Sequence, residues 1–483
     1  MQEVRADLSL KRGRPSRTGI QRNWHRFGDP GARLLLDVQT GSLHAIDEAA
    51  WAVLEALEQA DGGPLSLDSV GAVRPLPAET AGGHHSLDLQ WVQEVLDDLD
   101  LLMEQGVLTY PDEPDTDVGE LGPGVLKAMC LHLAHDCDMR CGYCFAGTGG
   151  FGGARALMPA KVGMAALDLL VEASGHVRHL EVDFFGGEPL MNMEALCRIV
   201  QHGQELAEST GKVLKFTVTT NALGLTDEIG QFLNDNGIAA VLSLDGRARV
   251  HDAVRRGVDG KGTFAAAAAN ALKFVNSRKG GEYYIRGTYT RRNLDFVDDV
   301  LFLADMGFET ISFEPVVAEA SSPYSIREED LPDVFASYDR LVGAMAQRHA
   351  AGQGFRFFHF DLDIAHGPCL AKRLMGCGAG REYAAVTPDG KLYPCHQFVG
   401  RPGFEMGDVH RGIIRPEVGE QFGAAHIYAK PACRECWARF MCSGGCHANA
   451  HQMAGSLHQP YAIGCAITKK RLESALALKA LTS

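Results

Sequence analysis

Three closely spaced cysteines are the residues whose chemistry organises this chain. They follow the short apolar run Val125–Leu133 with the spacing C-x3-C-x2-C: Cys137, Cys141 and Cys144. Three thiolates this close can hold three irons of a [4Fe–4S] cluster, which leaves the fourth iron free to bind and reduce a small molecule. The alternative is structural zinc, which requires four ligands in a closed site. His132 and His135 precede the run, but an obvious fourth zinc ligand does not follow it.

This run resembles the signature of radical S-adenosylmethionine (SAM) enzymes, because an aromatic residue, Tyr143, precedes the last cysteine. Three later motifs strengthen the resemblance, the first being similar to the GGEP motif of that family: Gly186-Gly187-Glu188-Pro189, Thr219-Thr220-Asn221 and Ser243-Leu244-Asp245-Gly246. The resemblance implies that the open iron chelates the amino and carboxylate groups of SAM. It also implies that Tyr143 lies against the adenine and that the GGEP motif binds the amino group.

Each motif residue also has a purely structural interpretation. Glu188 can accept hydrogen bonds from an ammonium group, and the glycines before it let the backbone approach a ligand, but a turn carboxylate is the alternative. Asn221 and Ser243 are expected to contact the ligand or to cap strand ends. Asp245 is expected to contact SAM or the substrate, to act as a base, or to open the turn before Gly246.

Two charged residues in later strands extend the expected site. Arg286 lies inside a predicted strand, where its guanidinium can pair with the SAM carboxylate. Glu314 lies near the end of the next strand and is a further pocket carboxylate. Asp245 and Glu314 are therefore the candidates for catalysis, and the sequence does not choose a general base.

A second group of cysteines lies near the C-terminus, where Gly390 stands five residues before Cys395. The pattern resembles the SPASM extension of radical SAM peptide modifiers, which holds two auxiliary [4Fe–4S] clusters and makes three in all. The resemblance implies two ligand sets: Cys369, Cys377, Cys395 and Cys446 for the first cluster, and Cys433, Cys436, Cys442 and Cys465 for the second. Two zinc ribbons are the alternative. Cys369 lies outside the core pattern, and without it the first auxiliary cluster has an open iron that a substrate thiol can occupy.

Alternating strands and helices must position these residues. Short apolar runs predict six strands: Val125–Leu133, His179–Phe185, Lys215–Thr220, Ala239–Leu244, Tyr283–Tyr289 and Thr310–Pro315. Helical patterns lie between them: Gly163–Ala173, Met193–Ala207, Asp227–Asn236, Phe264–Asn276 and Leu294–Met306. Six β/α repeats predict a parallel sheet with right-handed crossovers, and hence an α/β fold with a partial (β/α)6 barrel, which is also the radical SAM core. The motifs follow the ends of the first four strands, where barrel enzymes gather their chemistry.

The first part of the chain predicts a separate small domain. After a polar, basic tail (1–22) that we expect to be disordered, residues 33–46 predict a hairpin, and helices are expected after Asp47 and over 88–105, with a closing strand at 106–110. Residues 23–110 resemble the winged-helix-like peptide-recognition element of ribosomal-peptide maturases. In that family an exposed strand edge pairs with an extended leader peptide. A winged helix that binds DNA or serves packing is the alternative.

The remaining boundaries and the composition limit the class of protein. A Pro/Gly-rich linker (111–124) leads to the radical SAM core (125–350) and the SPASM domain (351–483), which ends in a helix near 467–481. A formal charge of −15 argues against nucleic-acid binding. No apolar run approaches the roughly 20 residues that cross a bilayer, and no signal peptide is evident, so we predict a cytoplasmic protein with no membrane partner. Thirteen cysteines in such a chain indicate metal rather than disulfides; Cys130 and Cys197 are expected to be buried thiols.

The resemblance implies an activity. Radical SAM enzymes use a one-electron reduction of SAM to make a radical that removes hydrogen from unactivated carbon, and auxiliary clusters accept the further electron released when a thiol joins that carbon. Residues 23 to 481 are similar to two thioether-forming maturase groups: one for Cys-rich (SCIFF) peptides, with bonds to α-carbons, and one for the quinohemoprotein amine dehydrogenase small subunit, with bonds to Asp and Glu side chains. The Ala/Gly/Arg-rich composition favours the second. The expected partners are a ribosomally made peptide or small subunit with a leader, and an electron donor of the flavodoxin or ferredoxin type. The alternatives are a sulfatase-activating or epimerising SPASM enzyme and a zinc-dependent scaffold without activity.

Overall fold

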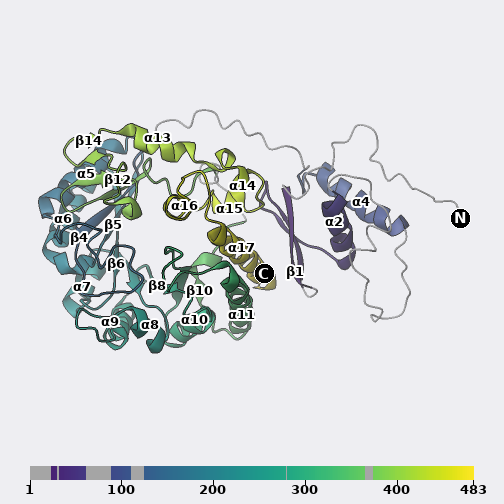
Figure 1. Cartoon of the computed structure of the whole chain (residues 1–483), viewed down its shortest axis with the longest axis horizontal. Coiled ribbons are helices and arrows are strands. Elements are labelled where there is room, and N and C mark those ends of the chain that lie inside the picture. The colour runs from purple at the N-terminus through teal and green to yellow at the C-terminus, as the bar shows by residue number, and fades with distance from the viewer. Residues whose placement is uncertain are drawn as a thin grey trace.

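The structure is a computed structural model that describes residues 23–29, 32–60, 89–109, 124–278, 280–364 and 374–482. The predicted tail (1–22), nearly all of the predicted linker (111–124) and Cys369 lie outside the described residues. Two sheets organise the rest: a three-stranded sheet near the N-terminus and an eleven-stranded sheet that runs through the barrel and into the C-terminal region (Figure 1).

The small sheet is antiparallel, with the strand order β1-β2-β3. It consists of β1 (Trp24–Asp29), β2 (Ala32–Asp37) and β3 (Leu43–Ala45). The predicted hairpin is confirmed as β2 and β3, whose turn begins where Asp37 Oδ1 accepts hydrogen bonds from the amides of Gln39 and Thr40, both at 2.9 Å. The sequence reasoning missed β1, which pairs with β2 along its whole length.

Two helices cover one face of this sheet. They are α2 (Glu48–Ala60) and α4 (Leu89–Glu104), and Asp47 caps α2 by accepting a hydrogen bond from the amide of Ala50 at 2.7 Å. The predicted closing strand at 106–110 is wrong over its described residues, which form a turn instead. Its course is set by Asp37, whose Oδ2 accepts hydrogen bonds from both the amide and the hydroxyl of Thr109 at 2.6 and 2.8 Å.

The predicted parallel sheet is confirmed, with its strands adjacent in chain order. Its six strands are β4 (Ala128–Ala134), β5 (His179–Gly186), β6 (Val213–Thr220), β7 (Ala239–Ser243), β8 (Tyr283–Tyr289) and β9 (Thr310–Pro315). The short strand β10 (Arg356–Phe357) adds to β9 in parallel. At the other edge β11 (Tyr383–Val386) adds to β4 in parallel, and three short strands follow antiparallel: β12 (Lys391–Tyr393), β13 (Gly407–Asp408) and β14 (Gly412–Ile413). The C-terminal region therefore continues the barrel sheet.

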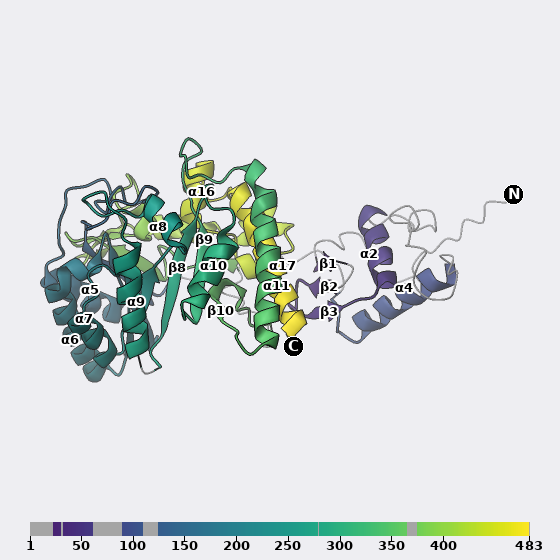
Figure 2. The same ribbon diagram turned by 90° about the horizontal axis from the view of Figure 1, so that it is seen from below.

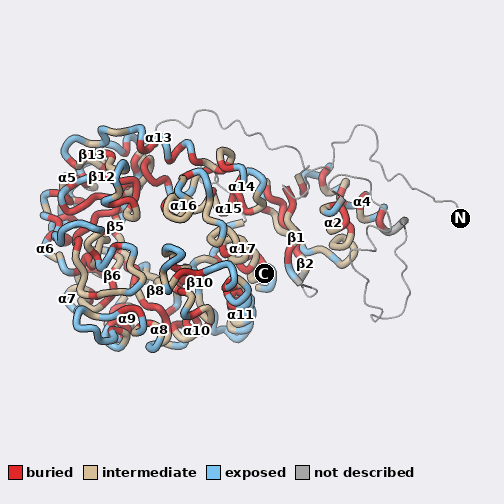
Figure 3. The backbone as a smooth tube through the Cα atoms, in the orientation of Figure 1, coloured by how far each residue is buried: buried red, intermediate tan, exposed pale blue. Residues whose placement is uncertain are grey.

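Helices cover the outer face of the barrel strands (Figures 1 and 3). They are α5 (Ala160–Ala173), α6 (Met193–Thr210), α7 (Asp227–Asp235), α8 (Ala248–Val254), α9 (Phe264–Ser277), α10 (Phe296–Asp305) and α11 (Leu331–Ala350). The core lies between these helices and alternate strand residues, such as Leu180, Val182 and Phe184 of β5, all fully buried. Helix α8 was not predicted.

The C-terminal helices are α13 (Pro416–Ala424), α14 (Pro431–Arg434), α15 (Arg439–Cys442), α16 (His447–Ala454) and α17 (Ala462–Thr482). Of these, α14, α15 and α17 lie between the barrel and the small sheet (Figure 1). Helix α17, longer at both ends than predicted, lies beside α11 (Figure 2). The second face of the small sheet packs there, because Phe27, Leu34 and Leu36 form one apolar cluster with Leu476 and Trp437.

Candidate functional site

The first cysteine run forms a loop directly after β4. The end of α8 holds this loop, since the amides of Arg140 and Gly142 donate to the carbonyls of Arg256 and Val254 at 2.7 and 2.9 Å. Burial raises the pKa of the Cys137 thiol to about 12 and that of Cys141 to about 11. The free thiols are therefore protonated at neutral pH, and a bound iron would have to displace their protons.

The two glycines at the end of β5 let that strand rest on the cysteine loop. The amide of Gly187 donates to the carbonyl of Ala134 at 2.7 Å, and the amide of Glu188 donates to the carbonyl of Asp136 at 2.9 Å. A Cβ on Gly186 or Gly187 would overlap these same carbonyl oxygens. Close backbone packing by itself thus requires both glycines, whatever ligand they also approach.

Glu188 ties the ends of β5 and β6 together. Its buried carboxylate accepts hydrogen bonds from the Thr220 hydroxyl at 2.7 Å, the Asn221 amide at 2.8 Å and the Leu190 amide at 3.1 Å. Burial raises the pKa of Glu188 to about 7, although the hydrogen bonds from Asn221 and Thr220 act in the opposite direction. Pro189 follows as the first residue of a short 3-10 helix, Pro189–Asn192.

Asn221 brings the third motif to the cysteines. Its side-chain amide donates to Asp138 Oδ1 at 2.7 Å and lies 3.8 Å from the sulfur of Cys137. The first cysteine, Glu188 and Asn221, which the sequence separates widely, are thus neighbours at one strand edge. The structure brings these predicted site residues together.

Asp245 is fully buried and surrounded by donors. Its carboxylate accepts hydrogen bonds from the Tyr143 hydroxyl at 2.5 Å and the Thr288 amide at 3.0 Å, and it forms an ion pair with Arg255 Nε at 3.0 Å. Burial first, and then the charge of Asp245, keep the pKa of Tyr143 well above its ordinary value, so the phenol stays protonated as the donor. This arrangement favours a role for Asp245 in positioning Tyr143. Arg255 is a residue that the sequence reasoning missed.

Arg286 and Glu314 pair with each other across the neighbouring strands β8 and β9. Burial alone would raise the pKa of Glu314, but Arg286 and His359 outweigh it and lower the pKa to about 2. Glu314 is therefore ionised at neutral pH and is a weak base. Ser243 is opposite Arg286 in the strand register.

The later cysteines fall into two neighbourhoods. Burial raises the pKa of Cys395 to about 12, and the nearby thiols of Cys446 and Cys377 add to the shift. Burial likewise raises the pKa of Cys433 to about 11, with smaller contributions from a second set of thiols: Cys442, Cys465 and Cys436. Cys369, which the resemblance adds to the first set, lies outside the described residues. The donors of both groups, soft thiols, suit iron–sulfur clusters. In the described part of the chain, none of these sets brings three side chains close enough together to hold a metal ion. Of the two remaining cysteines, Cys130 is buried as expected, but Cys197 is partly exposed.

Aromatic rings join the first cysteine loop to the C-terminal region. Phe145 directly follows Cys144, and its ring centroid lies 5.6 Å from that of His396, which directly follows Cys395. Phe185 of β5 lies 5.0 Å from the same imidazole. Burial lowers the pKa of His396 to about 4, so this ring is neutral at pH 7. The sequence reasoning missed the contact, whose only signal was that each ring follows a cysteine.

Comparison with known proteins agrees with this layout. Residues 121–253 match the model of a 4Fe-4S single cluster domain, and residues 377–437 match SPASM, an iron-sulfur cluster-binding domain. The PqqA peptide cyclase of Rhodopseudomonas palustris is 25% identical over 69% of this chain and 85% of its own. The mycofactocin maturase MftC of Mycobacterium ulcerans is 27% identical over 67% of this chain and 84% of its own. The chain is thus similar to radical SAM proteins that carry a SPASM domain.

Solved structures agree on the fold. The structure of anSMEcpe with bound AdoMet gives a TM-score of 0.62 at 18% identity, covering 74% of this chain and 98% of that one. Streptococcus suis SuiB bound to S-adenosylmethionine gives 0.51 at 15% identity, covering 92% and 98%. The predicted partial barrel is therefore confirmed. No helix in the described ranges is long and apolar enough to cross a membrane.

Proposed function

We propose that the protein is a radical SAM enzyme that forms thioether cross-links within a ribosomally made peptide, from a cysteine sulfur to an unactivated carbon. The observation that carries the proposal is the contact of Phe145 with His396, which places the first cysteine loop opposite the SPASM cysteines. A relative named PqqA peptide cyclase and another named mycofactocin maturase support a peptide substrate. The side-chain carbons of Asp or Glu are the favoured positions, and an α-carbon is the alternative.

The cysteines would hold the clusters in the three sets described above. The first loop would hold the cluster that reduces SAM, and the two SPASM sets would hold auxiliary clusters, with Cys369 as a proposed ligand of the first. When bound, these groups would supply a carbon-centred radical and a sink for the second electron. Overall, the peptide loses two electrons and two protons: one hydrogen atom leaves the carbon, and the thiol loses its proton as the C–S bond forms.

The protein residues around the first loop would orient the reactants. Asp245 holds the hydroxyl of Tyr143, and Glu188 fixes the strand ends on which the loop rests. Asn221, beside Cys137, and Ser243 are proposed SAM contacts. Arg286 is proposed to reach the SAM carboxylate by exchanging its partner Glu314, which leaves Glu314 free to meet the substrate.

The N-terminal domain would bind the leader along β3. This strand pairs with β2 and with no other strand of the described residues. The amides of Asp37 and Ile46 bond to the carbonyls of Ser42 and Arg33 at 2.9 and 3.0 Å. Since hydrogen-bonded pairs alternate along an antiparallel ladder, the amides of Leu43 and Ala45 point away from β2. They are therefore available to an added strand.

Two measurements on anaerobically purified protein test the proposal. Iron and sulfide analysis should give about twelve irons per chain for three clusters, and a co-expressed substrate should lose two hydrogens per cross-link by mass spectrometry. Cys137→Ala should abolish 5′-deoxyadenosine formation. The matched control is Cys197→Ala on α6, outside all three sets, which should keep it. Zinc without sulfide, or normal cross-linking by the Cys137 variant, would refute the proposal.

A further inference from the structure

A cavity of about 240 Å³ lies where β7 and β8 end, between α8 and the loop that follows β8. Three arginines line it, Arg247 and Arg249 from the start of α8 and Arg292 from the loop, together with Thr288 and Asp295. Two of the elements that line it, α8 and β8, also serve the proposed site. Helix α8 holds the cysteine loop, and Thr288 donates its amide to Asp245.

The lining of this cavity holds three arginines but only one aspartate, Asp295. Arg247 is neutralised by ion pairs with Asp299 at 2.7 Å, Asp295 at 2.9 Å and Asp298 at 3.5 Å. Arg249 and Arg292, in contrast, form no ion pair with any residue that the structure describes. The neighbouring Arg255 and Arg291, by contrast, are paired with Asp245 and with Glu329 and Asp330.

One wall of the cavity leads directly to the cysteine loop. The Arg292 guanidinium lies 4.6 Å from the centre of the Tyr324 ring. The hydroxyl end of Tyr324 closes over Gly142, where a Cβ would overlap it. Tyr324 also packs edge-on against Tyr143 at 6.4 Å. A group bound between Arg249 and Arg292 would therefore lie beside the loop that holds the first cysteines.

We propose that this cavity binds a carboxylate of the substrate peptide, the side chain of an Asp or Glu residue. The inference rests on the proposed function and adds a substrate class to it. Guanidinium groups suit carboxylates because their paired N–H donors match the two oxygens. Arg249 and Arg292 are both exposed, so an extended chain can reach them from solution, whereas SAM must lie deeper, against the cysteines. A peptide anchored here would present its neighbouring residues to the site.

A binding experiment that needs no turnover tests the inference. The probes are two fluorescein-labelled hexapeptides that differ only in one Glu or Gln, and their affinities for the anaerobic holoenzyme are measured by fluorescence anisotropy. The Glu peptide should bind about tenfold more tightly, because hydrogen bonds from guanidinium to a charged carboxylate are stronger than those to a neutral amide. The double variant R249Q/R292Q should lose this preference. The matched control is Arg411→Gln, an exposed arginine in the turn between β13 and β14 that pairs with Asp408, which should keep it.

The outcomes separate this inference from the proposed function. Equal binding of the two peptides by the unmodified protein would overturn the carboxylate site, even if SAM is cleaved and a substrate is cross-linked. A second measurement, the SAM affinity of the same variants by equilibrium dialysis, tests whether the cavity binds SAM instead. A tenfold loss of SAM affinity in R249Q/R292Q would assign the cavity to SAM and would also overturn the inference. A preference for the Glu peptide that the double variant lacks would support it, whether or not the chemistry is a thioether.

Discussion

At the scale of single residues, the site depends on one buried ion pair, that of Asp245 with Arg255. If either side chain were removed, water could not take its place beside the other, because Asp245 is fully buried and Arg255 nearly so. The same carboxylate also accepts the Tyr143 hydroxyl and the Thr288 amide. Removing one partner of a buried pair leaves an uncompensated charge, which is far more costly than losing an exposed pair.

Asp245→Asn should therefore lower the free energy of unfolding by about 3–5 kcal/mol, because Arg255 would remain charged and buried. Chemical denaturation of the anaerobic protein measures the change. The control is Asp259→Asn, which removes an exposed carboxylate paired with Lys261 and should not shift the denaturation midpoint. Equal midpoints for Asp245→Asn and the unmodified protein would mean that the pair does not support the fold.

His251 makes the stability of the same cluster depend on pH. Its Nδ1 accepts the Asp245 amide at 3.3 Å, and its Nε2 lies 3.1 Å from the Thr263 hydroxyl, which itself donates to the carbonyl of Arg255. Only the neutral ring with its proton on Nε2 satisfies these contacts. Burial, and then the charge of Arg255, lower the pKa of His251 to about 4.

The unfolded chain protonates this histidine near pH 6.5, well before the folded chain does. His251 therefore contributes stability above that pH, and the contribution is lost as pH falls from 6.5 towards 4. Between pH 7 and pH 5 the loss is about 2 kcal/mol. His251→Asn removes the titration, so the stability gap between the two proteins should narrow by that amount on acidification. Urea denaturation at a series of pH values measures it, and a gap that is constant from pH 7 to pH 5 would contradict the assignment.

Sequence reasoning foresaw which motif residues would gather, but not how each would be used. Parallel strands align their carboxyl ends, so the order of motifs along the chain was enough to place Glu188, Asn221 and Asp245 at one edge. Their roles depend on partners that no motif contains. Arg255 pairs with Asp245 from an unpredicted helix, and Glu314 pairs with Arg286 because the register of β8 and β9 aligns their faces.

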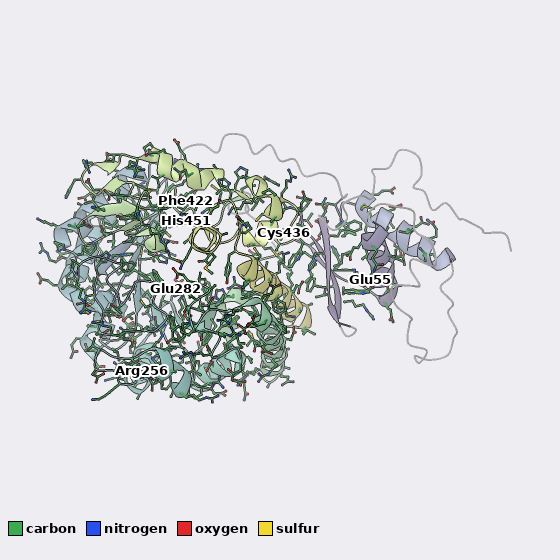
Figure 4. All side chains as sticks on the ribbon, viewed as in Figure 1. Glu55, Arg256, Glu282, Phe422, Cys436 and His451 are labelled. Carbon is green, nitrogen blue, oxygen red and sulfur yellow. The ribbon has the colours of Figure 1, made fainter. Side chains whose placement is uncertain are left out.

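At the scale of elements, the small sheet is held between its own helices and the SPASM domain. His25 of β1 stacks on Trp437 at 3.8 Å and contacts Glu473 of α17 at 2.9 Å. Trp437 directly follows Cys436, which Figure 4 places on the side of the C-terminal helices that faces this sheet. The sequence could not predict this docking, since β1 lacks a strand-like alternation and its apolar partners lie on α17, far along the chain.

Ala45→Pro tests the free edge of β3 without breaking the small sheet. Proline removes the amide that points away from β2 and leaves the β2–β3 ladder intact. Modification of a leader-bearing substrate should fall at least about tenfold, because leader binding loses one backbone hydrogen bond. Cleavage of SAM without substrate should continue. Ala45→Thr keeps the amide and is the control. This is a milder test than deleting residues 1–110, which would expose the apolar surface around Leu476.

At the scale of the whole molecule, one continuous sheet carries both cysteine regions. β11 pairs in parallel with β4, which leads to Cys137, and β12, which leads to Cys395, pairs antiparallel with β11. The sequence predicted two separate domains there, because strands as short as β12, β13 and β14 leave no periodic signal. This shared sheet is the physical reason to expect that the regions cooperate on one substrate while each retains its own task.

That division of tasks gives a final prediction. Cys433→Ala removes a proposed ligand from the second auxiliary set and touches nothing in the loop after β4, which α8 and β5 hold independently. The iron content should therefore fall from about twelve to about eight per chain. Formation of 5′-deoxyadenosine should continue, but cross-linked product should be lost, because the second electron has no acceptor. Chromatography of the nucleoside and mass spectrometry of the peptide measure the two outcomes in one reaction. If both fell in parallel, the second set would instead support the fold of the whole site.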